Sequence, residues 1–288
     1  MMKIGVSSYS LYKAMRDDGM TILEAMEWIK ENGAEHVEIV PLGFDLVKTP
    51  SLIEDIRNKA EELDLEISNY AIGANFIQES IEKVNEEIKR VKQHVDIANQ
   101  LGARLMRHDA ASRPMEETGI EQFYGDLPIL VDACREIADY ASQYGITTSV
   151  ENHGYYLQSS ERVEILVKLV NRPNFKTTLD VGNFLCVDEV PEAAVKNNLP
   201  ISSMVHLKDF YYRPAAEDPG EGFFSTRNGN FLKGAILGQG DINIRNVFRL
   251  IKNSAYKGFL SLEFEGMEDC KIATKIGLQN IKRIWEEV

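Results

Sequence analysis

Thr147-Thr-Ser-Val-Glu-Asn-His153 is the stretch from which the fold can be worked out. Four residues that favour β-strands lead into a carboxylate, an amide and an imidazole, and Gly154 follows. Because alternate residues of a strand share a face, Glu151 and His153 are expected on one side of the strand end. A buried carboxylate is costly unless a partner compensates its charge. The rest of the chain should therefore supply partners for Glu151.

Short β-rich runs alternate with longer amphipathic stretches along the whole chain. The predicted strands are residues 3–8, 36–40, 66–72, 103–108, 146–153, 175–181, 203–208 and 258–264. The predicted helices are residues 21–32, 51–63, 80–101, 124–144, 160–170, 189–197, 242–253 and 268–287. Thr21 and Ser51, each followed three residues later by glutamate, fit the capping-box pattern at a helix start.

Eight strand–helix units, repeating about every 30 to 40 residues, indicate a parallel sheet. A G-x-G-x-x-G motif does not follow the first strand, which disfavours an open dinucleotide-binding sheet. The pattern predicts an α/β protein in which residues 1–288 form a single domain, a closed (β/α)8 barrel.

Two long irregular stretches interrupt this alternation. Residues 109–123 follow the fourth strand, and residues 210–240 follow the seventh and are rich in glycine and phenylalanine. Loops of this length in a compact domain are usually functional or disordered. Both lie on the C-terminal face of the predicted barrel, where active sites of this fold occur. We expect residues 210–240 to form a lid or a subunit contact.

Composition and charge exclude several classes of protein. The net charge of −13 argues against binding nucleic acid or an anionic membrane surface, because either needs a basic face. No apolar run is long enough to cross a bilayer, and the first residues lead directly into a strand rather than a signal peptide. Three scattered cysteines suit a reducing compartment, so a cytoplasmic protein is expected.

The last four predicted strands each end in a residue that can bind a metal ion. These residues are Glu151, Asp180, His206 and Glu263. Taken singly, each has an ordinary explanation: a surface or capping glutamate, a turn aspartate, a core histidine. Together on neighbouring strand ends, three carboxylates would repel one another without a cation. The set suits one divalent ion, Mn²⁺, Mg²⁺ or Co²⁺, with Zn²⁺ also possible.

Four strand ends carry a family resemblance: Glu-Asn-His-Gly (151–154), Leu-Asp-Val-Gly-Asn (179–183), His-Leu-Lys-Asp (206–209) and Glu-Phe-Glu-Gly (263–266). They resemble the xylose isomerase-like TIM-barrel superfamily, which includes sugar phosphate isomerases and epimerases, inositol-catabolism isomerases and dehydratases, and endonuclease IV. The similarity runs from Val-Glu-Ile (37–39) to the last strand. It implies that Glu151, Asp180, His206 and Glu263 bind one divalent metal ion, and that Glu151 and Glu263 act as an acid/base pair.

Two departures from the family pattern narrow the function. Endonuclease IV relatives hold a three-zinc cluster with an Asp-x-His after the seventh strand, whereas residues 237–243 here contain no histidine. Several epimerases place a substrate-contacting histidine shortly after the sixth strand, where this chain has Asn183. The first departure disfavours a phosphodiesterase, and the second puts those epimerases' particular substrates in doubt.

The expected reaction is metal-dependent isomerisation or epimerisation of a small sugar or keto-polyol. The metal would polarise a carbonyl and its adjacent hydroxyl, and the two glutamates would move a proton through an enediolate. A dehydratase acting on a keto-inositol or related polyol is the alternative. An endonuclease IV-type phosphodiesterase and a non-catalytic sugar-binding barrel are less favoured. An unphosphorylated substrate is preferred, because no glycine-rich phosphate cradle follows the seventh strand, and a homo-oligomer is possible.

Further residues are assigned from their positions near strand ends. Candidates for substrate contact, each with a structural role as its alternative, are His153, His108, Asn183, Lys208 and Arg213. Glu38 is expected to orient a donor, whereas His36 and His94 are read as loop and helix-surface residues. An apolar wall that shields the enediolate, with ordinary packing as its alternative, is assigned to Tyr9, Tyr70, Phe76, Phe184 and Phe210.

Overall fold

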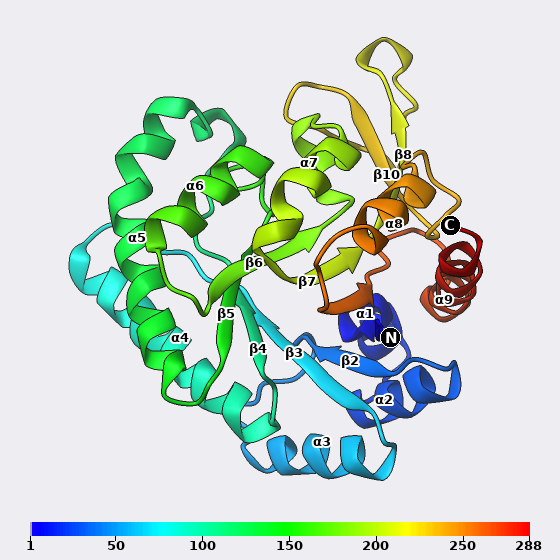
Figure 1. The fold of residues 1–288 in the computed structure, drawn as a ribbon, viewed down its shortest axis with the longest axis horizontal. Coiled ribbons are helices and arrows are strands. Elements are labelled where there is room, and N and C mark those ends of the chain that lie inside the picture. Colours follow the sequence, from blue (N-terminus) through cyan, green and yellow to red (C-terminus); the bar gives the residue numbers. More distant parts are fainter. Residues whose placement is uncertain (1) are drawn as a thin grey trace.

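Eight parallel strands close into a barrel in the computed structural model, which describes residues 2–288 (Figure 1). They follow the order β1-β11-β7-β6-β5-β4-β3-β2 around the barrel. Their bounds are β1 Ile4–Ser7, β2 His36–Ile39, β3 Glu66–Ile72, β4 Leu105–His108, β5 Thr147–Glu151, β6 Phe175–Asp180, β7 Ser202–Leu207 and β11 Phe259–Leu262. The predicted closed (β/α)8 barrel is confirmed.

Helices cover the outside of the barrel, as Figure 1 shows. They are α1 Tyr12–Asp17, α2 Ile22–Glu31, α3 Ser51–Glu62, α4 Ile81–Leu101, α5 Ile120–Ser142, α6 Ser160–Val170, α7 Pro191–Asn198, α8 Ile244–Lys252 and α9 Cys270–Glu287. Short 3-10 turns are η1 Ser8–Leu11, η2 Met115–Glu117, η3 Asn183–Val187, η4 Leu199–Ile201 and η5 Ala215–Glu217. Within residues 2–288, no helix combines the length and the apolar character needed to span a membrane.

One of the two predicted helix caps is present in the structure, and the other is not. The capping box of Thr21 and Glu24 is present at α2. The predicted cap by Ser51 is wrong, because Pro50 takes the cap position, Ser51 is the first helical residue, and no side chain caps α3. Helix α1 was not predicted, since six residues carry too short a pattern, and α5 begins at Ile120 rather than at 124.

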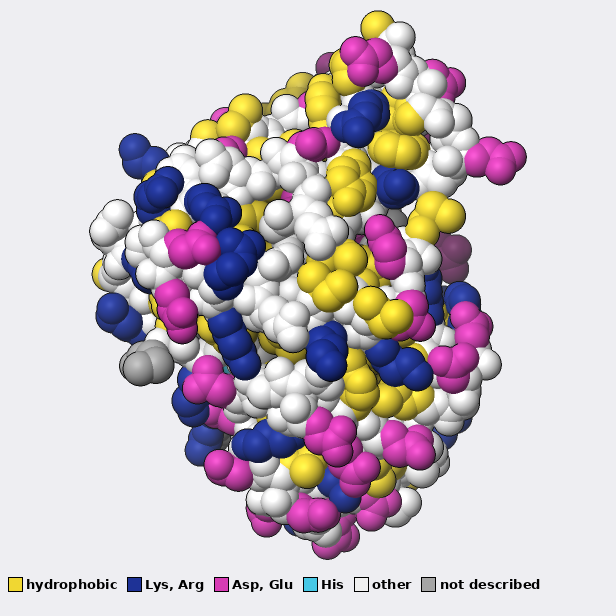
Figure 2. All heavy atoms as spheres, turned by 90° about the vertical axis from the view of Figure 1, so that its right-hand side faces the viewer, with side chains coloured by type: hydrophobic (Ala, Val, Ile, Leu, Met, Phe, Trp, Pro, Cys, Tyr) yellow, Lys and Arg dark blue, Asp and Glu magenta, His cyan; other side chains and the backbone are white. Residues whose placement is uncertain are grey.

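The stretch 210–240 contains a small antiparallel sheet rather than the predicted irregular loop. Its strands are β8 Asp209–Arg213, β9 Phe224–Ser225 and β10 Phe231–Ala235, in the order β8-β10-β9. Figure 2 shows part of the molecule projecting at the top, and Figure 1 places this projection beside β8 and β10. Gly234 in β10 pairs with Gly266, and a Cβ there would lie 1.8 Å from the carbonyl oxygen of Glu265. The glycine therefore lets this sheet pack directly on the barrel rim.

Strand register brings the predicted ligands to one rim. Asp180 on β6 is opposite His206 on β7, and His206 is opposite Ser261 on β11, two residues before Glu263. A register shift in β2 between Val37 and Glu38 places Asn69 of β3 opposite Glu38. Such irregularities redirect side chains near sites. The C-terminal end of the barrel thus collects acidic and imidazole groups from strands far apart in the sequence.

Candidate metal centre

Four side chains meet inside the C-terminal end of the barrel. Glu151 ends β5, Asp180 ends β6, His206 belongs to β7, and Glu263 follows β11 directly. One ligand atom from each lies within 4.8 Å of the others, and all four residues are buried. Among residues 2–288, these four form the one group of this kind. The structure therefore assembles the complete set that the sequence predicts.

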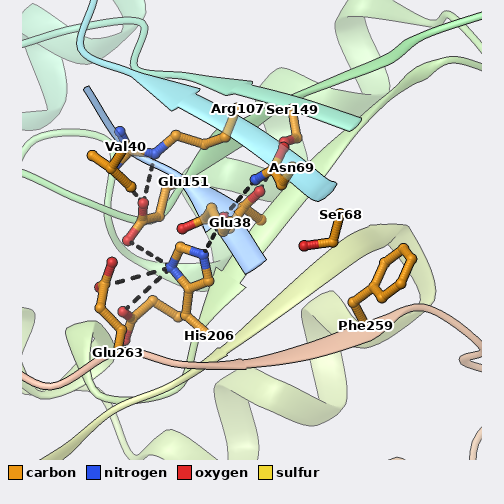
Figure 3. A network of polar contacts seen from close by, with 12 residues as sticks. Glu38, Val40, Ser68, Asn69, Arg107, Ser149, Glu151, His206, Phe259 and Glu263 are labelled. Atoms are coloured by element: carbon orange, nitrogen blue, oxygen red, sulfur yellow. Dashed lines mark hydrogen bonds and ion pairs between the residues drawn. The ribbon is translucent and has the colours of Figure 1, made fainter. Parts of the chain in front are cut away.

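His206 is held in one orientation by a buried carboxylate (Figure 3). Its Nε2 lies 2.9 Å from Oε2 of Glu38, which also accepts a hydrogen bond of 2.7 Å from Nδ2 of Asn69. All three side chains are buried. A carboxylate behind an imidazole fixes the ring and its tautomer in metal sites. Glu38 thus orients the His206 ring, which agrees with the expectation that it orients a donor group.

The other ring nitrogen of His206 faces the three carboxylates. Its Nδ1 lies 3.7 Å from Oε1 of Glu151, 3.9 Å from Oδ2 of Asp180 and 3.7 Å from Oε2 of Glu263. These separations are too long for hydrogen bonds. His206 Nδ1 is buried without a hydrogen-bond partner, and the buried Asp180 Oδ2 makes no hydrogen bond but lies beside the Lys208 ammonium group. One cation between these atoms would satisfy the nitrogen and the oxygens together.

The charges around the cluster also favour a cation between these side chains. Burial lowers the pKa of His206, but the carboxylates of Glu38, Glu263 and Glu151 raise it well above its usual value. Burial raises the pKa of Asp180 to about 7, with the carboxylates of Glu263 and Glu151 adding to the increase. The cluster therefore favours a positive charge at its centre, and its oxygen-rich composition fits a divalent metal ion.

Lys208 supplies a positive charge from the chain itself. Its Nζ lies 3.1 Å from Oδ2 of Asp180, 2.7 Å from Oε2 of Glu263 and 3.2 Å from Oε2 of Glu265. The lysine is buried, and these carboxylates raise its pKa well above the usual value although burial lowers it. Lys208 also lines the pocket above the cluster, so a predicted substrate-contact residue is present there.

Arg107 of β4 fixes the other side of Glu151. Its Nε donates a hydrogen bond of 2.6 Å to Oε2 of Glu151, and its guanidinium lies 3.5 Å from Oδ1 of Asp109. Although burial raises the pKa of Glu151, Arg107 contributes most to holding that pKa well below its usual value. Oε1 of the same carboxylate faces His206 and accepts a hydrogen bond of 3.0 Å from Asn183. Each oxygen of Glu151 therefore has its own partners.

The pocket above the cluster has a volume of about 400 Å³. We call it the inner cavity. Its polar lining comes from Glu38, Arg90, His94, Arg107, Asp109, Glu151, His153, His206, Lys208, Glu263 and Glu265. Val40, Pro41, Leu42 and Ile72 supply apolar surface. Pockets of this size bury small organic ligands.

The other predicted substrate residues have different surroundings. His153 lines the inner cavity, with Nδ1 3.7 Å from Oδ1 of Asp109. Asn183 is buried behind Glu151 and accepts a hydrogen bond of 3.2 Å from Lys208. His108 lies outside the cavity, buried between aromatic rings, and Arg213 on β8 pairs with Asp241 at 3.1 Å. The structure thus brings His153, Asn183 and Lys208 to the site, but neither His108 nor Arg213.

The alternation of side chains along β4 explains why Arg107, rather than the predicted His108, lines the inner cavity. Neighbouring residues of a strand point to opposite faces. Met106 is buried against the helices, and His108 shares its face, which leaves Arg107 to face the inner cavity. Because Leu105, on the face of Arg107, is apolar as well, the sequence of this strand alone did not distinguish the two faces. Asp109, which follows the strand, was also missed.

Two histidine predictions are wrong. His36 lies in strand β2, fully buried, rather than in a loop. His94 belongs to α4, as expected, but it lines the inner cavity instead of the outer helix surface, with Nδ1 2.8 Å from the hydroxyl of Tyr70. Of the five aromatic residues assigned to an apolar wall, Tyr9 lines the cavity. The other four are buried in packing positions: Tyr70, Phe76, Phe184 and Phe210.

Comparisons with known proteins agree with this architecture. Inosose dehydratase 1 from Bacillus cereus is 22% identical over 214 residues, covering 70% of each chain. The apo structure of 3-keto-D-glucoside 4-epimerase, YcjR, from E. coli has a TM-score of 0.73 at 16% identity, covering 98% of this chain and 100% of that chain. A xylose isomerase-like TIM barrel protein from Mycobacterium smegmatis in complex with magnesium has a TM-score of 0.71 at 18% identity. The match covers 99% of this chain and 98% of that chain.

Sequence and fold together establish the family. The model described as xylose isomerase-like TIM barrel matches residues 26–285, which is most of the chain. With its closed barrel and its ligand-type residues on neighbouring strand ends, the chain belongs to the xylose isomerase-like TIM barrel family.

Proposed function

We propose that this protein is a divalent-metal-dependent isomerase or epimerase of a small sugar or keto-polyol. One observation carries the proposal. Three buried carboxylates surround an imidazole nitrogen that has no protein partner, at the floor of a pocket of about 400 Å³. The relative solved with magnesium supports a divalent ion in this family, and the epimerase relative supports the reaction type.

The reaction follows from the two glutamates. A divalent ion held by Glu151, Asp180, His206 and Glu263 would polarise a substrate carbonyl and its neighbouring hydroxyl, which acidifies the adjacent C–H bond. Glu151, kept ionised beside Arg107, removes this proton and leaves an enediolate. Glu263 takes up a proton from water and delivers it to the opposite face or to the neighbouring carbon, while Glu151 releases the abstracted proton to water, so both carboxylates return to their starting state. Solvent hydrogen therefore enters the product at carbon.

An unphosphorylated substrate fits the charges of the inner cavity. Arg107 is paired with Glu151 and Asp109, and Lys208 with Glu265 as well as with two metal-ligand carboxylates. Arg90 is paired with Glu87 at 2.8 Å. Each of these cations already has an acidic partner, so an added phosphate would have to compete with those carboxylates for the cations. We assign substrate contact to His153 and Lys208, and a supporting part to Asn183.

Isotope exchange tests the proposal. Metal-loaded protein is incubated in D₂O with a panel of ketoses and keto-inositols, and carbon-bound protons are followed by NMR. Deuterium should enter next to the carbonyl with the wild type and not with Glu151→Gln. Absence of exchange with every compound, despite one bound metal ion, would reject enolisation at this site.

A dehydratase is the second candidate, favoured by the 22% identity to an inosose dehydratase over 70% of both chains. The same proton removal would then be followed by loss of a hydroxyl group as water from the next carbon. Mass analysis separates the two reactions, because only dehydration yields a product lighter by one water molecule. Isomerisation and epimerisation leave the mass unchanged.

Other expectations stay part of the proposal. The cysteines at 134, 186 and 270 are unpaired, which favours a reducing, cytoplasmic location. Basic and acidic side chains are interspersed on the face shown in Figure 2, which gives nucleic acid no basic stripe on that face. The β8-β10-β9 sheet is a candidate contact in a homo-oligomer or a cover over the site.

A further inference from the structure

A second cavity adjoins the inner cavity at the barrel rim. We call it the outer cavity; its volume is about 310 Å³. It lies between the segment that follows β1, including Tyr12 and Lys13, and the segment that follows β11, including Phe264. Tyr9 and Glu265 line both cavities. A ligand that spans both cavities would therefore contact these two side chains.

The lining of the outer cavity combines aromatic surface with hydrogen-bond donors. Tyr12 is half-buried, and the Arg16 guanidinium lies 5.5 Å from its ring centre. Lys13 Nζ donates a hydrogen bond of 2.6 Å to the carbonyl oxygen of Gly266, which holds the ammonium group against the cavity. A sugar ring presents apolar C–H groups on its faces and hydroxyl groups at its edge. Aromatic rings suit the faces, and cationic N–H groups suit the hydroxyl oxygens.

Close packing fixes the wall of this cavity. Gly266 pairs with Gly234 of β10, and a Cβ on Gly266 would lie 2.4 Å from the ring of Phe264. Ser10 Oγ donates a hydrogen bond of 3.1 Å to the Leu262 carbonyl oxygen and accepts one of 2.9 Å from the Phe264 amide. The two rim segments are thus joined to each other and to the small sheet. A cavity formed before binding costs less ordering entropy when a ligand enters.

From these observations we propose that the outer cavity is a second subsite, which binds the non-reacting unit of a two-unit substrate such as a glycoside. The reacting keto unit occupies the inner cavity beside Glu151 and Glu263, so the inference rests on the proposed function. Arg16 is already paired with Asp17 at 2.7 Å, which favours an uncharged sugar or polyol in the subsite over an anionic group.

Paired probes test the subsite by binding rather than by turnover. D-Fructose is the one-unit probe, and leucrose and palatinose, which are fructose carrying a glucosyl unit at O5 or O6, are the two-unit probes. Titration calorimetry with manganese-loaded protein should show the better disaccharide binding roughly tenfold more tightly than fructose. Tyr12→Ala and Lys13→Ala should each reduce this ratio. Tyr124→Ala, at an exposed tyrosine of α5, is the matched control and should keep the wild-type ratio.

The outcomes separate the subsite from the proposed reaction. Neither disaccharide binding better than fructose at millimolar concentration would overturn the subsite, as would an unchanged ratio in both variants. Deuterium exchange on the panel of ketoses and keto-inositols remains the test of enolisation. Exchange without a disaccharide advantage would reject the subsite alone, whereas a Tyr12-dependent advantage without exchange would support the subsite and reject the reaction.

Discussion

Replacing Glu38 with glutamine tests how the imidazole of the metal centre is held. Glu38 Oε2 lies 2.9 Å from His206 Nε2 and accepts a hydrogen bond of 2.7 Å from Asn69, with all three side chains buried. Glutamine keeps the shape and can still accept through its oxygen, but it removes the charge. Hydrogen bonds to charged groups contribute about 1.5–3 kcal/mol and neutral ones about 0.5–1.5 kcal/mol. The difference corresponds to roughly a tenfold loss of metal affinity.

The assay is calorimetric titration of Mn²⁺ into metal-free wild type and Glu38→Gln. Asp126→Asn is the control, because it weakens a partly buried ion pair of 2.7 Å between α5 and Arg113 without touching His206. The control should bind Mn²⁺ as the wild type does. Equal affinities of wild type and Glu38→Gln would refute the role of this carboxylate. Equal losses in both variants would instead indicate a general effect of destabilisation.

Three further predictions concern packing, pH and the metal ligands. Gly234→Ala should lower the free energy of unfolding by about 1–3 kcal/mol, because its Cβ would lie 1.8 Å from the Glu265 carbonyl oxygen. Gly125→Ala, in α5 with no atom within 4 Å of the new Cβ, should raise the free energy of unfolding by about 0.5–1 kcal/mol; similar urea denaturation of the two variants would contradict this reasoning. Burial lowers the pKa of His108 to about 4 from 6.5, so the unfolded chain takes up this proton first and stability is lost as the pH falls from 6.5 toward 4. The loss should reach about 2 kcal/mol near pH 5, and His108→Gln should show a weaker pH dependence in urea denaturation; an unchanged dependence would exclude this histidine as its source. Asp180→Asn should abolish the rise in Tm that Mn²⁺ gives the wild type, because it removes one carboxylate from the four ligand groups; a retained rise in Tm would remove Asp180 from the ligand set.

The barrel and its acidic cluster were predictable because both follow from regular strand geometry. Eight β-rich runs separated by amphipathic helices leave few arrangements other than a closed parallel barrel. In such a barrel all strands end on one face, so residues such as Glu151 and His206 must approach one another. The prediction needed only the strand ends, which turn signals such as Gly154 marked.

Contacts between distant segments were not predictable from local patterns. The pairing of β10 with β8 joins Phe231 to Arg213 across a connection with no regular sequence signal, so residues 210–240 read as a loop. Arg213 then turned toward Asp241 instead of the pocket. His94 faces the inner cavity because its ring meets Tyr70, a contact that helix periodicity alone does not reveal. Tertiary partners decided each of these positions.

Strand periodicity also explains how an acidic cluster can be buried in this fold. His206 and Lys208 are two residues apart, so both side chains point to the inside of the barrel rim. One presents a ring nitrogen to Glu151, Asp180 and Glu263, and the other places an ammonium group against two of these carboxylates. A single strand end therefore provides both a metal ligand and a counter-charge.

Removing one partner from a buried ion pair costs several kcal/mol, about 3–5 kcal/mol in general. Lys208→Met should consequently destabilise the metal-free protein more than the metal-loaded protein, because a bound divalent ion then compensates the same carboxylates. Thermal unfolding with Mn²⁺ and with a chelator measures both effects, and an equal loss under the two conditions would show that Lys208 and the metal ion do not share these carboxylates.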